Sequence, residues 1–121
     1  MTTQEIANRY YELAGQGKWT EIQDELHDDQ VICQEPEHAA QRGLNVITKG
    51  KEANKAKSAA NRAMIETLHS QYCSEPYVAG NFFSLVLKRD VTFKGRPRIN
   101  IEEVCVFQVA EGKIVLEQFF Y

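Results

Sequence analysis

INIEEVCVFQVAEGKIVLEQFFY, residues 99–121, is the stretch that decides the predicted fold. Two runs rich in β-branched and aromatic residues, 99–109 and 113–121, flank the tripeptide Ala110-Glu111-Gly112. Such runs favour β-strands, and the short segment between them favours a hairpin turn. Glycine as the third of three loop residues is typical of a type I turn with a G1 bulge, because that position needs a positive φ.

Both sides of this hairpin are expected to be apolar. With Val109 paired to Lys113, one side carries Val104, Val106, Ile114, Leu116, Gln118 and Phe120, and the other carries Ile101, Glu103, Cys105, Phe107, Val115, Glu117, Phe119 and Tyr121. A sheet that is covered on one side only shows one polar face, so we expect this sheet to be covered on both. The same pairing makes Glu103 and Glu117 diagonal neighbours on one side.

The bulk composition indicates one soluble globular domain over residues 1–121. Hydrophobic residues make up 43% of the chain and charged residues 26%, as in an ordinary globular protein. A net charge of −3 is too small to favour a nucleic-acid partner. No apolar run approaches the roughly 20 residues that span a membrane, and the first residues lack the regions of a signal peptide.

The cysteines and histidines argue against a disulfide framework and against a metal site. The three cysteines are an odd number, lie far apart and form no CxxC motif, so we expect reduced, mostly buried thiols in a cytoplasmic protein. The three histidines are scattered, with no pair at helical spacing, and no nucleotide motif is present. We therefore expect neither a metal nor a cofactor. The residues concerned are Cys33, Cys73, Cys105, His27, His38 and His69.

The remainder of the chain places helices before long strands, which defines an α+β class. Helices are expected over 2–15, 19–26 and 51–63, and strands over 30–34, 64–73 and 77–93, the last with a bulge or bend at Gly80. Residues 37–50 are expected to be mostly loop, with a short strand over 44–48. The third helix carries a stripe of alanines that would let it lie close against the sheet: Ala53, Ala56, Ala60 and Ala63.

Motifs in three stretches resemble the SnoaL-like branch of the NTF2-like superfamily. The first stretch runs from Arg9-Tyr10 through Gly17-Lys18-Trp19 and Asp28-Asp29 to Glu35-Pro36, the second is residues 78–83, and the third comprises 102–107, 111–114 and 117–121. The resemblance implies a cone, in which three N-terminal helices wrap the concave side of a curved, mostly antiparallel sheet and enclose a pocket. It also implies a homodimer through the convex side, which would present Val104, Val106, Leu116 and Phe120.

Four residues are candidates for acid–base chemistry. Glu103 and Glu117 would lie on an apolar wall, where lost solvation and a second carboxylate raise the pKa of a carboxyl group toward neutrality. The superfamily includes ketosteroid isomerases, and by that resemblance Glu35, which precedes a proline, would abstract a proton while Tyr10 stabilises the enolate. The alternatives stay open: each acid is bonded to a tyrosine, a lysine or backbone, or is solvated, and Tyr10 is a core residue.

The leading hypothesis is a pocket protein that binds a small, largely apolar molecule. Its pocket would be lined by Tyr11, Trp19, Cys105, Phe107, Phe119 and Tyr121, although aromatic residues more often form core than a ligand platform. As an enzyme, the protein would catalyse proton transfer of the isomerase or cyclase type without a cofactor. The sequence leaves open whether it is an enzyme. The alternatives are a non-catalytic ligand carrier or sensor and a dimeric scaffold.

Overall fold

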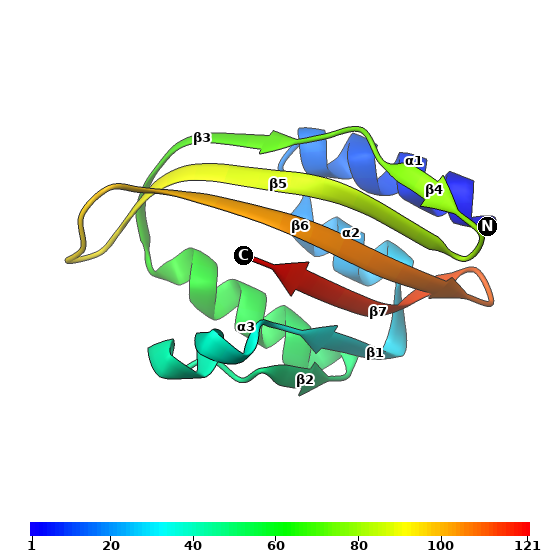
Figure 1. Cartoon of the computed structure of the whole chain (residues 1–121), viewed down its shortest axis with the longest axis horizontal. Helices are drawn as coiled ribbons and strands as arrows, with labels where there is room; N and C mark the ends of the chain where they lie inside the picture. Colours follow the sequence, from blue (N-terminus) through cyan, green and yellow to red (C-terminus); the bar gives the residue numbers. More distant parts are fainter.

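The computed structural model describes all 121 residues, and its helices and strands follow the order shown in Figure 1. The elements are α1 (Thr3–Gly15), α2 (Trp19–Leu26), β1 (His27–Gln34), the 3₁₀ helix η1 (Glu37–Arg42), β2 (Ile47–Lys49), α3 (Lys51–Ala63), β3 (Ile65–Cys73), β4 (Tyr77–Ala79), β5 (Phe82–Phe93), β6 (Ile99–Ala110) and β7 (Lys113–Phe120). The three α-helices begin and end close to the residues that the sequence predicts.

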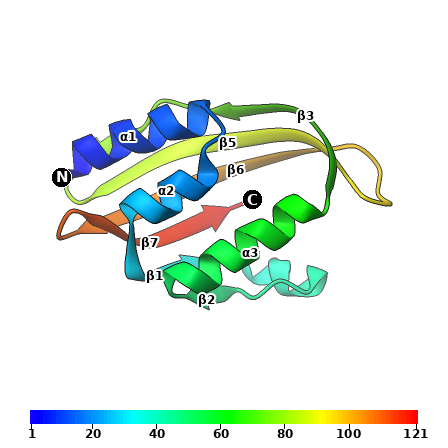
Figure 2. The same ribbon diagram turned by 180° about the vertical axis from the view of Figure 1, so that it is seen from behind.

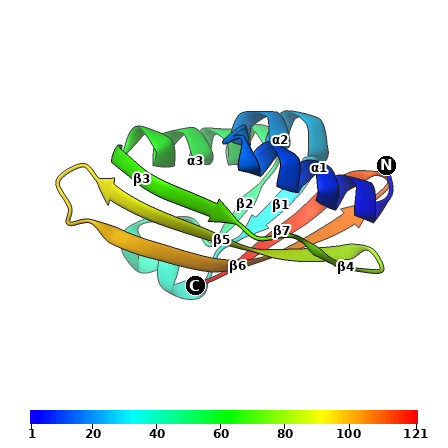
Figure 3. The same ribbon diagram turned by 90° about the horizontal axis from the view of Figure 1, so that it is seen from above.

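Seven strands form one curved sheet, and all three α-helices lie on the same side of it (Figure 3). The strand order is β2-β1-β7-β6-β5-β3, with β4 beside β5, and only β1 and β7 run parallel. Seen from the helix side in Figure 2, α1 and α2 cross one part of the sheet, and α3 crosses the part near β1 and β2. The predicted cone, a mostly antiparallel sheet wrapped by three helices, is confirmed.

The first helix shows why the sequence-based boundaries hold. Thr2 caps α1 in a reciprocal capping box with Glu5, in which each side chain bonds the backbone N–H of the other residue. Ile6, Tyr10 and Leu13 recur at helical spacing and are buried, so this face of α1 packs on the sheet. The spacing of the apolar residues determines which side of α1 is buried, and the capping box determines the residue at which the helix begins.

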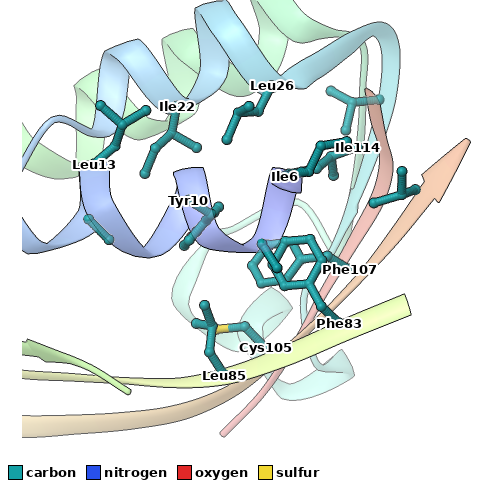
Figure 4. Packing of buried hydrophobic residues seen from close by; sticks show 14 residues of the cluster. Ile6, Tyr10, Leu13, Ile22, Leu26, Phe83, Leu85, Cys105, Phe107 and Ile114 are labelled. Atoms are coloured by element: carbon teal, nitrogen blue, oxygen red, sulfur yellow. The ribbon is translucent and has the colours of Figure 1, made fainter. Parts of the chain in front are cut away.

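An aromatic cluster fills the space beneath α1 (Figure 4). The rings of Phe83 on β5 and Phe107 on β6 stack with centroids 4.6 Å apart, and the ring of Tyr10 lies 4.8 Å from that of Phe107. Leu13 from α1 and Ile22 from α2 belong to the same buried cluster. Close-packed aromatic rings supply much of the apolar burial in a domain of this size. This end of the cone is therefore a solid core.

Helix α3 turns a different side toward the sheet from the one that the sequence predicts. The alanines expected to face the sheet, Ala53, Ala56, Ala60 and Ala63, are all exposed. The buried residue of this helix is Asn54, whose side chain donates to the carbonyl oxygens of Thr48 and Gly50. Half-buried Ser58 accepts a hydrogen bond of 2.9 Å from Gln23 on α2. The prediction of an apolar contact was wrong, because this helix turns its polar side toward the rest of the protein.

Three other sequence-based boundaries differ from the structure. Strand β1 begins at His27 rather than at residue 30, and η1 and β2 occupy much of the segment expected to be loop. The expected long strand over 77–93 is two strands, because a turn at Gly80 reverses the chain and pairs β4 with β5. Gly80 has a φ of 61°, a conformation that suits a tight turn rather than a bulged strand.

The closing hairpin has a two-residue loop, so its predicted register was wrong. Ala110 pairs with Lys113, and Glu111 and Gly112 have φ angles of 51° and 75°, as in a type I′ turn. A bulge then leaves Val115 as an extra residue on β7, and Phe107 pairs with Glu117.

The bulge restores the alternation that a two-residue loop would reverse. Glu103 and Glu117 therefore stay on the helix side of the sheet, as predicted. They are not diagonal neighbours, because Phe107, the partner of Glu117, lies four positions from Glu103 on β6.

This turn predicts a measurable cost for a side chain at Gly112. A Cβ atom there would lie 3.1 Å from the backbone nitrogen of Met1, on a residue with positive φ. Gly112→Ala should lower the free energy of unfolding by about 1–2 kcal/mol in urea denaturation. The control is Gly15→Ala, because a Cβ atom at Gly15 meets nothing within 4 Å and φ there is not positive. Equal stability of the two variants would contradict the assigned turn.

Candidate functional site

Three carboxylates gather where α3 crosses the sheet: Glu35 just after β1, Glu103 on β6 and Glu117 on β7. Glu35 and Glu117 are buried, with 9% and 7% of their surface exposed, and Glu103 is half-buried. Glu35 and Glu117 both act electrostatically on Glu103, and so does Lys57 of α3. The fold therefore brings Glu35, which the sequence analysis treated separately, into one neighbourhood with Glu103 and Glu117.

Glu35 is held by two donors from distant parts of the chain. The ammonium group of Lys57 donates to its Oε1 atom over 2.8 Å, and the hydroxyl of Tyr121 donates to its Oε2 atom over 2.8 Å. Both carboxylate oxygens are therefore engaged in hydrogen bonds. Neither oxygen is left without a partner in the chain. Its geometry suits it to fixing Lys57 and Tyr121 in place.

Lys57 also reaches the thiol of Cys33, with its Nζ atom 3.2 Å from the sulfur. Burial raises the pKa of the Cys33 thiol to about 12, an effect that Glu117 strengthens and Lys57 opposes. Burial also raises the pKa of Cys105 well above its usual range. Since the thiolate is the reactive form of cysteine, these two side chains are buried, protonated thiols rather than nucleophiles at neutral pH.

Glu103 is the acid that is free to exchange a proton. Its carboxyl group forms no hydrogen bond within the chain. Burial raises its pKa to about 7, while Arg89 opposes the shift and the charges of Glu35 and Glu117 add to it. A carboxyl group that titrates near neutral pH can serve as an acid or a base at comparable cost. Of the three acids, Glu103 has the properties that proton transfer requires.

Glu117 lies against His27, a residue that the sequence analysis did not single out as part of a site. The Nε2 atom of His27 is 3.3 Å from Oε2 of Glu117, which is within ion-pair distance. The two atoms are not aligned as a hydrogen bond, and both ring nitrogens of His27 are enclosed without a partner. His27 cannot meet a ligand directly, so any influence it has on chemistry passes through Glu117.

The hydroxyl of Tyr10 faces the same neighbourhood, although its ring belongs to the aromatic core. Burial raises the pKa of Tyr10 well above its usual range, and the charges of Cys105, Glu117, Cys73 and Glu103 act in the same direction. Tyr10 therefore remains neutral, a form that can donate a hydrogen bond.

The polar atoms of this neighbourhood differ in their access to the surrounding space. The fully enclosed side-chain atoms without a hydrogen-bond partner belong to Gln23, His27 and Thr48. The oxygens of Tyr10, Glu103 and Glu117 are not among them, although they form no hydrogen bond within the chain. They therefore retain accessible surface, and a small molecule that reached this space would meet unpaired oxygen atoms.

The residues predicted to line a pocket lie in different parts of the structure. Tyr11 is 39% exposed on the outer face of α1, so its assignment to the interior was wrong. Phe107 is buried in the aromatic cluster, and half-buried Trp19 packs edge-on against Tyr10. Cys105, Phe119 and Tyr121 are on the side of the sheet that bears the acids, and Cys105 pairs directly with Phe119.

The structure has two surface hollows, of about 200 and 400 Å³, and Arg89 is among the residues that line the smaller one. The smaller is formed by strands β3, β5 and β6, and the larger by α2 and α3. Neither is lined by Glu35, Glu103 or Glu117, so a ligand pocket at the acids stays a prediction. No group of three or more His, Cys, Asp and Glu side chains is placed to hold a metal ion. No helix is long and apolar enough to cross a bilayer.

Sequence reasoning missed three charged or titratable residues at this site: His27, Lys57 and Arg89. One signal pointed to Lys57. Asn54, Lys57, Ser58 and Asn61 recur at spacings of 3, 1 and 3, so they form a polar stripe on one side of α3. Arg89 shares the inner side of β5 with Phe83 and Leu85. The sequence signal for Arg89 was a positive charge at a position where the alternation of apolar residues predicts a side chain on the inner side of the sheet.

Comparison with known proteins gives a consistent result. The profile of the SnoaL-like domain matches residues 1–121, and no functionally curated protein matches the chain. A crystal structure of a candidate SnoaL-like polyketide cyclase from Mesorhizobium loti is 34% identical, with all of both chains covered and a TM-score of 0.91.

Two further solved structures share the fold and were obtained with small molecules. TerC, co-crystallised with polyporic acid, is 18% identical over 98% of this chain and 90% of its own, with a TM-score of 0.77. A protein with a ketosteroid isomerase-like fold from Catenulispora acidiphila, in complex with trimethylamine, is 20% identical over 83% of this chain and 72% of its own, with a TM-score of 0.66.

Glu103 predicts a pH-dependent difference in stability. Its pKa rises from 4.5 in the unfolded chain to about 7, so its favourable contribution is complete below pH 4.5 and is lost as pH rises through 7. The stability of Glu103→Gln, which stays neutral, should rise relative to that of wild type over this range, by about 3 kcal/mol at pH 8.

Chemical denaturation at several pH values measures this difference. The control is Glu102→Gln, since Glu102 is the adjacent, exposed residue on the other side of β6 and should show little change with pH. Parallel curves for wild type and Glu103→Gln between pH 4.5 and 8 would contradict the raised pKa of Glu103.

Proposed function

The chain belongs to the SnoaL-like domain family, and we propose that it binds a small molecule at Glu103 and transfers a proton at a carbon next to a carbonyl group. One observation carries the proposal. Glu103 forms no hydrogen bond within the chain, and its pKa is about 7. Glu35, by contrast, is bonded by Lys57 and Tyr121. The proton acceptor is therefore Glu103 rather than the residue before the proline.

The proposed reaction begins with ionised Glu103. The C–H bond of the ligand breaks, the proton forms an O–H bond on the Glu103 carboxylate, and the electron pair moves to the carbonyl oxygen as an enolate. Return of the proton to a different atom would complete an isomerisation. Attack of the enolate carbon on a second carbonyl group would form the ring bond and an alkoxide, and return of the proton from Glu103 to that alkoxide would complete a cyclisation. A neutral donor stabilises a developing enolate oxygen, and the hydroxyl of Tyr10 meets that requirement.

The other acids have supporting roles in this proposal. Glu35 keeps Lys57 and Tyr121 in fixed positions, and Glu117 adds negative charge that keeps the pKa of Glu103 high. Ligand binding is supported by two proteins of the same fold, one co-crystallised with polyporic acid and the other in complex with trimethylamine. The ligand is expected to be small, with an apolar part that contacts Phe119 and a carbonyl group near Glu103.

The reaction can be tested without knowledge of the natural substrate. Aromatic β-keto esters in D₂O lose the NMR signal of their α-protons when a base abstracts them, and wild type should accelerate this loss over buffer. Glu103→Gln should reduce the enzymatic rate by about 10²–10⁴, the usual contribution of a general base. Glu102→Gln, on the opposite side of β6, should keep the wild-type rate. Equal rates in wild type and Glu103→Gln would refute the role of Glu103.

The same pair of variants distinguishes the enzyme from a carrier. In a carrier or sensor, Glu103→Gln would still bind the esters and neither protein would accelerate the exchange. Ligand binding without exchange would therefore favour a carrier or sensor. The expected result for the enzyme is binding by both proteins and exchange by wild type alone.

We also propose that the protein is a homodimer through the outer side of its sheet. Val104 and Phe120 are 47% and 48% exposed there, and half-buried Val106 and Leu116 lie on the same side. Val104 pairs with Phe120, so the exposed side chains adjoin on neighbouring strands. A contiguous apolar patch on a sheet is typical of a subunit interface.

A charge in this patch should separate the subunits. Val106→Glu should elute as a monomer at concentrations where wild type is a dimer, because an unpaired charge would be buried in the interface. Size-exclusion chromatography with light scattering gives the mass. The control is Ala59→Glu, which adds the same charge on the exposed side of α3 and should remain dimeric. A dimeric Val106→Glu variant would contradict this interface.

A further inference from the structure

We propose that Arg89 binds an anionic oxygen of the ligand, a carboxylate or the enolate that proton transfer creates, in the space next to Glu103. This inference rests on the proposed function, since it assumes that a ligand reaches Glu103. It assigns a chemical class to the ligand and a role to a residue that the fold places beside the proton acceptor.

The register of the sheet places Arg89 on the helix side, near Glu103. In β5 it continues the alternation of Phe83 and Leu85, which are buried in the core. Arg89 pairs with Ile101 on β6, and Leu87 pairs with Glu103, so Arg89 and Glu103 are diagonal neighbours across two adjacent strands. Long side chains at diagonal positions on one side of a sheet can contact the same ligand atom.

The guanidinium group of Arg89 also reaches across to α3. Its Nη1 atom donates to Oδ1 of Asn61 over 3.2 Å, which joins β5 to the end of this helix. That contact fixes the direction of a half-buried side chain and uses one of its five N–H groups. The remaining N–H groups bond no other side chain. A planar group with several unused donors is suited to binding two oxygen atoms of one anion.

No carboxylate lies within ion-pair distance of Arg89, although Arg89 acts on ionised Glu103 at longer range, and this distinguishes it from the other cations near the site. Lys57 is paired with Glu35, and on the outer side Lys88 lies 3.5 Å from Glu102. Arg89 forms no ion pair. Glu103, the acid nearest in register, is neutral in a large share of molecules at pH 7. A half-buried cation without an anionic partner favours a ligand that supplies one.

Arg89 can interact with Glu103 before proton transfer and with the ligand oxygen after it. When Glu103 takes the proton, the negative charge passes from its carboxylate to the ligand oxygen. Arg89 interacts with the ionised carboxylate before this step and can interact with the enolate after it. A fixed cation beside developing negative charge lowers the barrier to proton abstraction.

Binding of a matched pair of probes tests the proposal, with benzoate as the anion and benzamide as its neutral analogue of nearly equal shape. Both are titrated into ¹⁵N-labelled protein near pH 6, where Glu103 is mainly neutral. Wild type should prefer benzoate. Arg89→Gln should weaken benzoate binding about tenfold or more and benzamide binding by less than about twofold. Arg89→Lys keeps the charge but not the planar guanidinium group, so its affinity for benzoate should lie between those of wild type and Arg89→Gln.

The control is Lys88→Gln, which removes one positive charge from the adjacent residue on the opposite side of β5 and should leave both affinities unchanged. Three results would overturn the proposal: no binding of benzoate by wild type, no preference for benzoate over benzamide, or equal losses in Arg89→Gln and Lys88→Gln. A folded Arg89→Lys that loses both probes equally would also overturn it, because that result indicates a structural role.

Failure of this inference and failure of the proposed function give different results. Exchange of α-protons that depends on Glu103, without a preference for benzoate, would refute only the role of Arg89. A benzoate preference that depends on Arg89, without any exchange of α-protons, would refute only the enzymatic reaction. In that second case the protein would be a carrier for anionic ligands.

Discussion

The arrangement of the site depends on the contacts that the ammonium group of Lys57 makes. It bonds Glu35 after β1 and lies beside Cys33 within β1, so it fixes α3 over the sheet. A second donor, the hydroxyl of Tyr121, brings the end of the chain to the same carboxylate. These contacts explain why α3 turns its polar side inward. A partner lowers the cost of burying the Glu35 carboxylate, and the alanine side of this helix could not provide one.

The interior is divided into a packed half and a polar half. Beneath α1, the rings of Tyr10, Phe83 and Phe107 form a close-packed cluster that holds β5 and β6 in place. Toward the far end of the same strands, the inner positions are taken by Glu103 and Arg89. The packed half keeps the backbone rigid, so the polar half can hold an unpaired acid at some cost in stability. Such a cost is typical of functional sites, where groups are left unbonded so that they can act on a ligand.

The sequence predicted the elements and the sides of the sheet better than it predicted the contacts. Helix α1 was predictable because its capping box and its apolar spacing are local signals. The side on which Glu103 and Glu117 lie was predictable although the loop was not, because the two-residue turn and the bulge at Val115 together preserve the alternation. The orientation of α3 was not predictable from hydrophobicity. Its polar stripe faces acids that are distant in sequence, as Lys57 and Glu35 are 22 positions apart.

Proton exchange near neutral pH at this site is assigned to Glu103. Its side-chain carboxyl ¹³C resonance, assigned by its absence in Glu103→Gln, can be followed by NMR from pH 4 to pH 9. We expect a midpoint near pH 7, because burial and the nearby charges of Glu35 and Glu117 raise the pKa of Glu103. A midpoint close to the ordinary value of 4.5 would show a solvated carboxylate and would exclude Glu103 as the acid that exchanges a proton near neutral pH.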